Sequence, residues 1–261
     1  MRSDAGMLSH EGVRKEKYNP QPDSVAIMFT QGDIVGLVAV YAYVGLVIVL
    51  AAKLKIVRSA KMHRKFVHIM VGNIVFIWWV FDSSYVMALL AAAPFIPLLI
   101  LASPYSPVKK IRDSFIGQTT GESHDLGLVY YAIAWTALAF FLFDERLIAS
   151  IAIVSMSYGD GMGGLIGKRF GKKKICGPKT LEGTTAVFVA TTLATFVVFV
   201  FYGWLNAQHL IIVPEFSLAA AGLFSLLIGA FVAVVELLTP GQYDNLVIPF
   251  GTAGLLLVAG L

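Results

Sequence analysis

The chain of 261 residues has few charged residues and almost no cysteine. Lys, Arg, Asp and Glu make up only 14% of it, whereas about 25% is usual in soluble domains. Cys176 is the only cysteine, so an intrachain disulfide is impossible and a cysteine-based zinc site is excluded in practice. We find neither a repeat of fixed period nor a low-complexity segment. The shortage of charge accompanies an apolar excess that requires a membrane.

Long apolar runs fill most of the chain, of which 57% is hydrophobic. A run of about 20 apolar residues crosses the hydrocarbon core of a bilayer. Because backbone in lipid must satisfy its own hydrogen bonds, continuous runs indicate helices and not the alternating strands of a barrel. The sequence therefore predicts an all-α fold, a polytopic membrane helical bundle of about eight transmembrane helices. The predicted spans lie near 34–52, 66–81, 85–101, 126–143, 147–158, 185–202, 217–238 and 245–261, of which 147–158 and 245–261 are the weaker.

Positive charge is concentrated in alternate loops. Eight spans place the loops 53–65, 102–125 and 159–184 on one face, and these loops hold 15 of the 20 Lys and Arg residues. Since Lys and Arg accumulate in short cytoplasmic loops, this face is predicted to be cytoplasmic and both termini to lie on the non-cytoplasmic side. The net charge of +4 then reflects topology, and no nucleic-acid partner is expected. Residues 1–33 are predicted to be a loose polar N-terminal tail, and 34–261 a single transmembrane domain.

The stretch GDGMGGLIGKRFGKKKICGPKTLEGT at 159–184 combines glycine, positive charge and a carboxylate. The apolar run 147–158 is too short to cross unless it continues through Asp160. Either the helix breaks at Gly159 or an aspartate lies in a membrane helix. Both arrangements are unusual, and both are typical of ligand or ion sites in membrane proteins. Asp160 is therefore the leading candidate for a functional residue.

Small residues follow Asp160 at helical spacing. If 160–171 is helical, Asp160 shares one face with Gly163, Gly164, Gly167 and Gly171. Two interpretations stay open, which are close packing against another helix and a bare surface that admits a phosphate chain. Basic residues beside a glycine-rich turn suit a polyphosphate cradle, although topology alone can explain the charges at 172–174. The basic residues are Lys168, Arg169, Lys172, Lys173, Lys174 and Lys179.

Nucleotide motifs of soluble proteins do not fit this stretch. GDGMGG matches G-x-G-x-x-G, but it follows a hydrophobic helix and not the strand that the motif requires. A P-loop requires glycine where Met162 stands, and Ser or Thr where Arg169 follows Lys168. A Rossmann or P-loop site is therefore excluded.

Other motifs place polar residues on the same face. In HRKFVHIMVG, Arg64 and Lys65 lie one helical turn before His68, which is a candidate proton acceptor or, alternatively, an interfacial anchor. In VELLTPGQYDNLVIPF, Asp244 and Asn245 begin the last span, where they suit Mg²⁺ or simple helix capping.

Two further carboxylates belong to the same face. Glu236 ends the seventh span. Glu122 precedes the fourth span, where a carboxylate also suits a helix N-terminus. This face combines carboxylates and cations and adjoins the bilayer. The combination favours phosphoryl or nucleotidyl transfer to a lipid, because such transfer depends on positioning and charge neutralisation.

At these residues the sequence resembles the membrane-embedded polyprenol kinase family, which includes dolichol kinase, phytol kinase and CTP-dependent diacylglycerol kinase. The resemblance extends from about residue 60 to the end of the chain. It lies in RKFVHIMVG at 64–72, GESHDLGLVYY at 121–131, the stretch at 159–184 and DNLVIP at 244–249.

The resemblance implies transfer of the γ-phosphate of CTP, or of another nucleoside triphosphate, to the hydroxyl of an isoprenoid or acyl lipid alcohol. Mg²⁺ is the implied cofactor, and the active site would lie in the transmembrane domain, facing the cytoplasm. Asp160, His68 and Asp244 become candidate catalytic residues, with Asp160 or His68 as the base, and Asp160, Asp244 and Glu122 become candidate metal ligands. The candidate nucleotide-binding residues are Gly159, Gly161, Gly163, Gly164, Gly167, Lys168, Arg169, Lys179, Glu182 and Asn245, and the candidate substrate or phosphate contacts are Arg64 and Lys65.

Two other functions stay open. A phosphatidate cytidylyltransferase, which makes a CDP-lipid, shares the K-T-x-E-G turn that begins at Lys179, but it needs an Asp-x-x-x-Asp pair. Gly164 and Ile248 stand where the partners of Asp160 and Asp244 would be, so the kinase is favoured. An ion or solute carrier would use Asp160 and Glu236 as intramembrane sites, but this leaves the adjacent cations unexplained.

Overall fold

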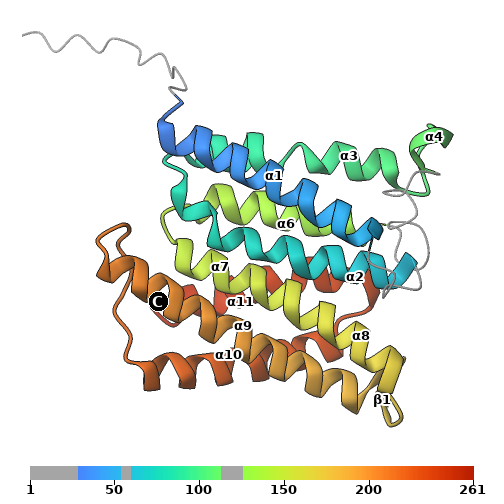
Figure 1. The fold of residues 1–261 in the computed structure, drawn as a ribbon. Coiled ribbons are helices and arrows are strands. Elements are labelled where there is room, and N and C mark those ends of the chain that lie inside the picture. The colour runs from blue at the N-terminus through green and yellow to red at the C-terminus, as the bar shows by residue number, and fades with distance from the viewer. Residues whose placement is uncertain (1–28, 54–59, 113–125) are drawn as a thin grey trace, which may run out of the picture.

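The protein is an all-α bundle whose long helices lie side by side between two ends (Figure 1). The structure is a computed structural model that describes residues 29–53, 60–112 and 126–261. The α-helices are α1 (Gln31–Lys53), α2 (Ala60–Val71), α3 (Phe95–Ala102), α4 (Lys109–Arg112), α6 (Gly127–Phe141), α7 (Arg146–Val154), α8 (Gly161–Phe170), α9 (Leu181–Ala207), α10 (Leu218–Leu238) and α11 (Asp244–Val258). A small hairpin of β1 (Lys174–Cys176) and β2 (Lys179–Thr180) precedes α9.

Tighter and wider helical turns interrupt this pattern. The 3₁₀ segments are η1 (Gly72–Phe76), η2 (Trp78–Val80) and η5 (Gly241–Tyr243). The π-helical segments are η3 (Val86–Ala92) and η4 (Ser155–Asp160). Each of the eight predicted spans corresponds to a helical stretch, but 66–81 is not one uniform α-helix, since α2 gives way to η1 and η2.

Three helices of the described chain, α1, α9 and α10, are long and apolar enough to cross a membrane. Their outward faces carry exposed apolar side chains such as Val38, Leu193 and Leu227, as lipid contact requires. Shorter apolar helices lie at Val86–Ala102 and Gly127–Phe141. The all-α membrane fold is therefore confirmed. The number of eight spans stays a prediction, and α1 begins three residues before the predicted domain boundary at 34.

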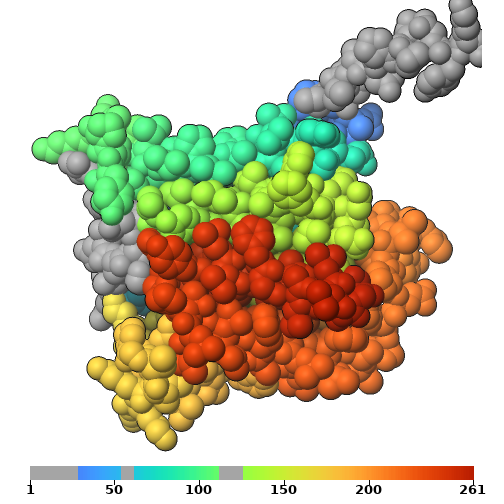
Figure 2. Space-filling model, turned by 180° about the vertical axis from the view of Figure 1, so that it is seen from behind, coloured from blue at the N-terminus to red at the C-terminus, as the bar shows by residue number. Residues whose placement is uncertain are grey.

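The basic segments lie at one end of the bundle. Near this end are the last turn of α1, the start of α2, the end of α8 and the β1–β2 hairpin (Figure 1). The described chain begins and ends at the opposite end. Seen from behind, α11 lies between α6 and α10 (Figure 2). Its first turn is at the basic end. The membrane side that the basic end faces stays a prediction.

The helix does not break at Gly159. Helix α7 passes through the π-helical η4 directly into α8, so Asp160 lies inside a continuous helix. This is the second of the two arrangements left open by the sequence. Single π-helical turns often occur at functional sites, because the extra residue changes which side chains face a neighbour. Here Asp160 is turned into the protein and is only 6% exposed.

Several glycines around Asp160 pack against α9, so the glycines do not form one bare face, although Gly164 and Gly171 are exposed. A Cβ atom on Gly159 would lie 2.6 Å from Thr191 Oγ1, and one on Gly163 would overlap Val187, both on α9. A Cβ atom on Gly167 would lie 3.3 Å from the Cα atom of Gly183, which is also on α9. The packing interpretation accounts for these three glycines. At Gly163 and Gly167 the structure favours packing over a bare surface for a phosphate chain, because α9 fills that side, and a contact of these glycines with a nucleotide stays a prediction.

Two further glycines of the motif, Gly161 and Gly164, face α2. A Cβ atom on Gly161 would overlap Ile69, and one on Gly164 would lie 2.8 Å from Lys65 Cε. Gly72 likewise permits close contact between η1 and η4, since a Cβ atom at this position would lie 2.5 Å from Ser157 Cβ. Glycine therefore brings α2 and η1 into close contact with the helix that carries Asp160.

The α8–α9 contact gives a direct test. Gly163→Ala should destabilise the protein by about 1–3 kcal/mol, because a methyl group must displace Val187 in a packed interface. The control is Gly254→Ala in α11, where the structure describes nothing within 4 Å of the new Cβ. That variant should be neutral or slightly more stable, since alanine favours a helix. Thermal unfolding in detergent measures both, and equal melting temperatures would contradict the packing interpretation.

Candidate active site

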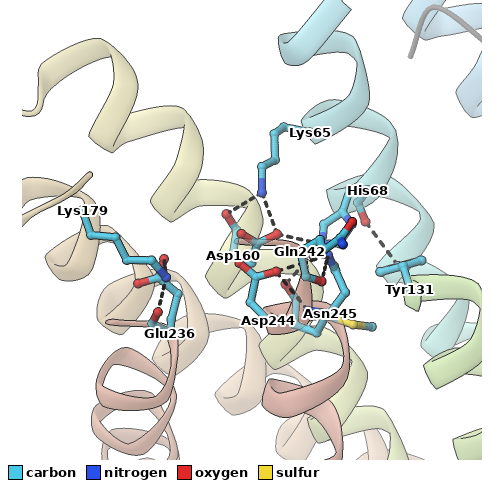
Figure 3. Close-up of polar contacts among 10 residues, drawn as sticks. Lys65, His68, Tyr131, Asp160, Lys179, Glu236, Gln242, Asp244 and Asn245 are labelled. Carbon is cyan, nitrogen blue, oxygen red and sulfur yellow. Dashed lines mark hydrogen bonds and ion pairs between the residues drawn. The ribbon is translucent and has the colours of Figure 1, made fainter. Parts of the chain in front are cut away.

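Polar side chains from five segments meet at the basic end of the bundle (Figure 3). Lys65 and His68 come from α2, Asp160 from η4, and Asp244 and Asn245 from the first turn of α11. Beside them Lys179 of β2 meets Glu236 near the end of α10. The segments are far apart in sequence, so the cluster is a product of the tertiary fold.

An ion pair between Lys65 and Asp160 lies at the centre of the cluster. Lys65 Nζ is 2.6 Å from Asp160 Oδ2 and also donates to the Asp160 carbonyl oxygen at 3.2 Å. The absent side chain of Gly164, one turn after Asp160, provides the space for the Lys65 methylene chain. This glycine thus acts on the site through Lys65 and not through a phosphate.

His68 lies beside the ion pair and is almost completely buried. Its Nε2 is 3.5 Å from Asp160 Oδ2 and 3.3 Å from the carbonyl oxygen of Met156. Because a carbonyl oxygen can only accept, the second contact requires a proton on Nε2 and leaves Nδ1 of a neutral ring as an acceptor. The ring also packs on Tyr131, at 4.3 Å between centroids. The predicted juxtaposition of His68 and Asp160 is therefore present in the structure.

Tyr131 and Ser157 hold this part of the site. The Tyr131 hydroxyl donates to the His68 carbonyl at 3.2 Å and contacts Ser157 Oγ at 3.0 Å. Ser157 Oγ in turn donates to the Ile153 carbonyl one turn back. Sequence reasoning did not select either residue. Tyr131 lies in the motif GESHDLGLVYY, which was the only available signal, whereas nothing in the sequence marks Ser157.

Asp244 and Asn245 present oxygen atoms toward the same space. Asp244 Oδ1 accepts from the Asn245 backbone nitrogen at 3.0 Å and from Asn245 Nδ2 at 3.3 Å. Asn245 Nδ2 also donates to the Gln242 carbonyl oxygen, so the amide is oriented. Its oxygen Oδ1 is buried and has no hydrogen-bond partner within the described residues. Asp244 thus accepts from one first-turn N–H of α11, as the capping interpretation expects, but this contact leaves Asn245 Oδ1 without a role.

The charges of the cluster favour a bound cation at Asp244. This carboxylate is 7% exposed and forms no ion pair with any described residue. Its charged neighbours include the carboxylates Asp160 and Glu236 as well as Lys65 and Lys179. A buried carboxylate near two others is costly in its charged form, so it takes up a proton unless a cation balances it. Carboxylate and amide oxygens are also the ligands that Mg²⁺ prefers, so Asp244 and Asn245 fit the expected metal.

The structure describes two of the three predicted metal ligands. Asp160 and Asp244 share the cluster, but Glu122 lies outside the described residues. Among the residues that are described, no three His, Cys, Asp or Glu side chains come together as a metal site. This small number of protein ligands is common for Mg²⁺, which usually binds one or two carboxylates together with the phosphates of a substrate.

The GPKTLEG segment forms the shaped turn that the sequence predicts. Gly177 adopts a left-handed φ of 53° between β1 and β2. Lys179 Nζ pairs with Glu236 Oε1 at 2.8 Å and also contacts the Glu236 carbonyl oxygen. Glu182 Oε2 accepts from the backbone nitrogens of Lys172 and Lys173, at 3.0 and 3.3 Å. Glu182 therefore holds the hairpin, and its contact with a nucleotide stays a prediction.

Three predicted cationic residues lie outside the buried cluster. Lys168 and Arg169 are exposed at the end of α8, and the Arg169 guanidinium lies over the Phe170 ring. Arg64 is half-buried on α2, next to Lys65. None of the three forms an ion pair within the described ranges. They are thus available to anionic groups that approach from water.

The fold and the cluster define an integral α-helical membrane protein with a buried acid–base site at one end of its bundle. Comparison with known proteins identifies the family. The chain is 31% identical over 228 residues to "Phytol kinase" from Synechocystis sp., a match that covers 84% of this chain and 88% of the relative. The chain therefore belongs to the phytol kinase family.

Plant relatives match over shorter stretches. "Phytol kinase 1, chloroplastic" from Arabidopsis thaliana is 27% identical over 57% of this chain and 51% of its own length. "Probable phytol kinase 2, chloroplastic" from Oryza sativa subsp. japonica is 28% identical over 72% of this chain and 63% of its own length. No protein-family model matches the chain, and no solved structure matches it significantly.

The central ion pair should contribute to stability. Lys65→Met leaves Asp160 buried without its cation, which typically costs about 3–5 kcal/mol, so the melting temperature in detergent should fall clearly. Adding Asp160→Asn to Lys65→Met should recover much of the loss, because no unpaired charge remains. Lys168→Met, which removes an exposed and unpaired lysine of the described chain, is the control. A Lys65→Met protein as stable as this control would refute the role of the pair.

Proposed function

We propose that this protein transfers the γ-phosphate of CTP, or of another nucleoside triphosphate, to the hydroxyl of an isoprenoid lipid alcohol of the phytol type. The observation that carries the proposal is the buried cluster of Asp160, Lys65 and His68 opposite Asp244 and Asn245, in a chain related to phytol kinases. The two alternatives, a CDP-lipid synthase and an ion or solute carrier, have no comparable support among the relatives.

The reaction needs a proton acceptor at the alcohol. An oxygen–phosphorus bond forms between the alcohol and the γ-phosphorus, the bond from that phosphorus to the bridging oxygen breaks, and a nucleoside diphosphate leaves. The alcohol proton must pass to a nearby base. Asp160 and His68 lie 3.5 Å apart and are the two candidates. Either can accept the proton, since the ion pair with Lys65 keeps Asp160 ionised and a neutral His68 has a free acceptor nitrogen.

Negative charge develops on the phosphate oxygens during transfer, and positively charged side chains are needed to neutralise it. Lys65 is already inside the cluster and can turn from Asp160 to a phosphate oxygen, because its ammonium has three donors. Lys179 lies beside Glu236 on the other side of Asp244 and is a second candidate. Lys168 and Arg169, at the exposed end of α8, would contact the outer part of the nucleotide. Phosphoryl transfer depends mainly on such positioning and charge neutralisation.

Mg²⁺ fits the oxygen atoms that the cluster leaves unused. Asp244 and Asn245 would hold it, together with Asp160 if Lys65 turns to the phosphates. When bound, the ion would neutralise negative charge that builds up on the phosphates during transfer. The chain's own contribution is to orient Asn245 through the Gln242 carbonyl oxygen and to exclude water from the buried carboxylates.

The location at the end of the bundle matches the two substrates. A nucleotide can approach the basic end from water, while the alcohol arrives laterally from lipid. The cluster of basic segments at this end supports an orientation toward the cytoplasm, because positive loops are retained there. This orientation is part of the proposal.

A labelled-lipid assay tests the function. Purified protein in detergent, given Mg²⁺ and CTP labelled on its γ-phosphate, should label phytol or geranylgeraniol in a panel that also contains dolichol and diacylglycerol. Asp160→Asn should lower the turnover number by about 10²–10⁴-fold, as removal of an acid–base or charge-stabilising group does. The matched control is Asp144→Asn, which changes an exposed aspartate at the opposite end of the bundle.

Three results would count against the proposal. Equal turnover by the Asp160→Asn and Asp144→Asn proteins would remove Asp160 from the mechanism. Release of pyrophosphate on addition of phosphatidate, without γ-label in the lipid, would identify a CDP-lipid synthase. Dissipation of an ion gradient in liposomes, with no labelled lipid, would identify a carrier.

Metal binding at Asp244 has a separate test. Asp244→Asn should raise the Mg²⁺ concentration needed for half-maximal activity by about 10–100-fold, since it removes a charged candidate ligand. Mg²⁺ with nucleotide should also raise the melting temperature of the unaltered protein, and this shift should shrink in the variant. An unchanged Mg²⁺ requirement would place the metal elsewhere.

A further inference from the structure

An apolar cavity of about 120 Å³ lies between α1, α2 with its 3₁₀ continuation, the η3–α3 segment and α6. These segments lie beside one another in the half of the bundle away from α9 and α10 (Figure 1). Its walls include Val44 of α1, Ile74 of η1, Ala91 of η3 and Trp135 of α6. Dry apolar cavities of this size accept apolar guests.

The cavity reaches the candidate active site at His68. Every other described residue that lines it is aliphatic or aromatic, and Tyr131, which packs on the His68 ring, is the neighbouring part of the wall. His68 Nε2 is 3.5 Å from Asp160 Oδ2. A guest in the cavity would therefore have one end at a candidate proton acceptor and the rest among hydrocarbon side chains.

The opposite end of the cavity is closed. Trp78, Phe81 and Met87 line it and are at most 1% exposed. The Trp78 indole nitrogen is fixed by Ser150 Oγ at 2.9 Å and also contacts the Tyr202 hydroxyl. The ten residues from His68 to Trp78 rise by about 15–20 Å as mixed α- and 3₁₀-helix. This length corresponds to a few isoprene units and not to a long polyprenol.

An opening lies near the polar end. Leu98 of α3 lines the cavity and is also 39% exposed, so the wall beside it meets the surroundings of the bundle. Farther along, Tyr41 of α1 donates to the Leu90 carbonyl oxygen at 2.5 Å and its ring contacts Phe95. These contacts join α1 to η3 and α3, so we assign the lateral entrance from lipid to the exposed wall at Leu98.

A second apolar groove has a larger volume, about 660 Å³, but its polar end is less suitably placed for the alcohol. It runs along α9 from Glu182 to Val197 and is also lined by Met162 and Tyr158. Its polar end is Glu182, whose carboxylate is engaged by two backbone nitrogens of the hairpin. A hydroxyl placed there would lie at the hairpin, whereas the first cavity ends directly at His68 and Asp160.

We propose that the cavity between α1, α2, η3–α3 and α6 binds the hydrocarbon chain of the alcohol, with the hydroxyl at His68 and the chain end toward Trp78. The closed end limits the length of the chain that can be bound completely. This inference rests on the proposed kinase function for its substrate, but the cavity can be probed without turnover.

Substitutions at the cavity wall test chain-length selection. Ala91→Phe should fill the middle of the cavity and lower kcat/KM for phytol by about tenfold or more, while a short prenol such as geraniol should be much less affected. Leu89→Phe, on the same segment but 48% exposed and outside the cavity, is the matched control. Met87→Ala should enlarge the closed end and increase activity on prenols longer than phytol.

The three variants separate a blocked cavity from a damaged protein. A general loss of activity on all chain lengths in Ala91→Phe, together with no gain in Met87→Ala, would overturn the inference. So would identical chain-length profiles for the Ala91→Phe and Leu89→Phe proteins.

Photolabelling separates this inference from the kinase proposal. A prenol with a diazirine at the chain end should label Trp78, Met87 or their neighbours, and excess phytol should reduce the labelling. Labelling of α9 at Val189 or Leu193 would instead assign the chain to the second groove. If no alcohol is phosphorylated but the cavity is labelled, the kinase proposal fails and the binding site stands.

Discussion

The buried ion pair between Lys65 and Asp160 constrains the whole site. Two charges removed from water are tolerated only when they lie close together and have further hydrogen bonds. α2 must therefore contact η4 at short range, which large side chains at the contact would prevent. Gly72, Gly161 and Gly164 are the positions at which this approach is made possible. The same approach places His68 beside Asp160, so the candidate base and the charge of the site are fixed by one helix contact.

Much of the fold could be predicted because it follows from local patterns. Continuous apolar runs determine helices in lipid, and the basic loops determine which helix ends lie together. The interruptions could not be predicted in the same way. Neither the π-helical turn at Asp160 nor the 3₁₀ turns after Gly72 have a distinct composition, since both depend on the neighbours that each helix meets. For the same reason the glycine face divides between α9 and α2.

The sequence selects several residues that the structure brings together, but it does not predict how they are arranged. Asp160, His68 and Asp244 stand out in the sequence because ionisable residues near membrane spans are costly and need a function. The pairing of Lys65 with Asp160, 95 residues apart, follows only from the packing of α2 on η4. The family resemblance makes Lys65 a candidate contact for substrate or phosphate, and the structure adds Asp160 as its partner inside the protein. The support of His68 by Tyr131 and Ser157 is likewise a tertiary feature.

His68 lies between the polar cluster and the apolar cavity. The proposed reaction between a nucleotide and a lipid needs one place where phosphates in a polar environment meet a hydrocarbon chain in an apolar environment. On one side of His68 lie Asp160, Lys65 and the oxygen atoms of Asp244 and Asn245, and on the other lies an apolar cavity. Because His68 and Asp160 are only 3% and 6% exposed, a charge–charge contact at this boundary is stronger than it would be in solvent. A buried histidine at the junction is therefore better suited to take the alcohol proton than a base at the exposed end of α8.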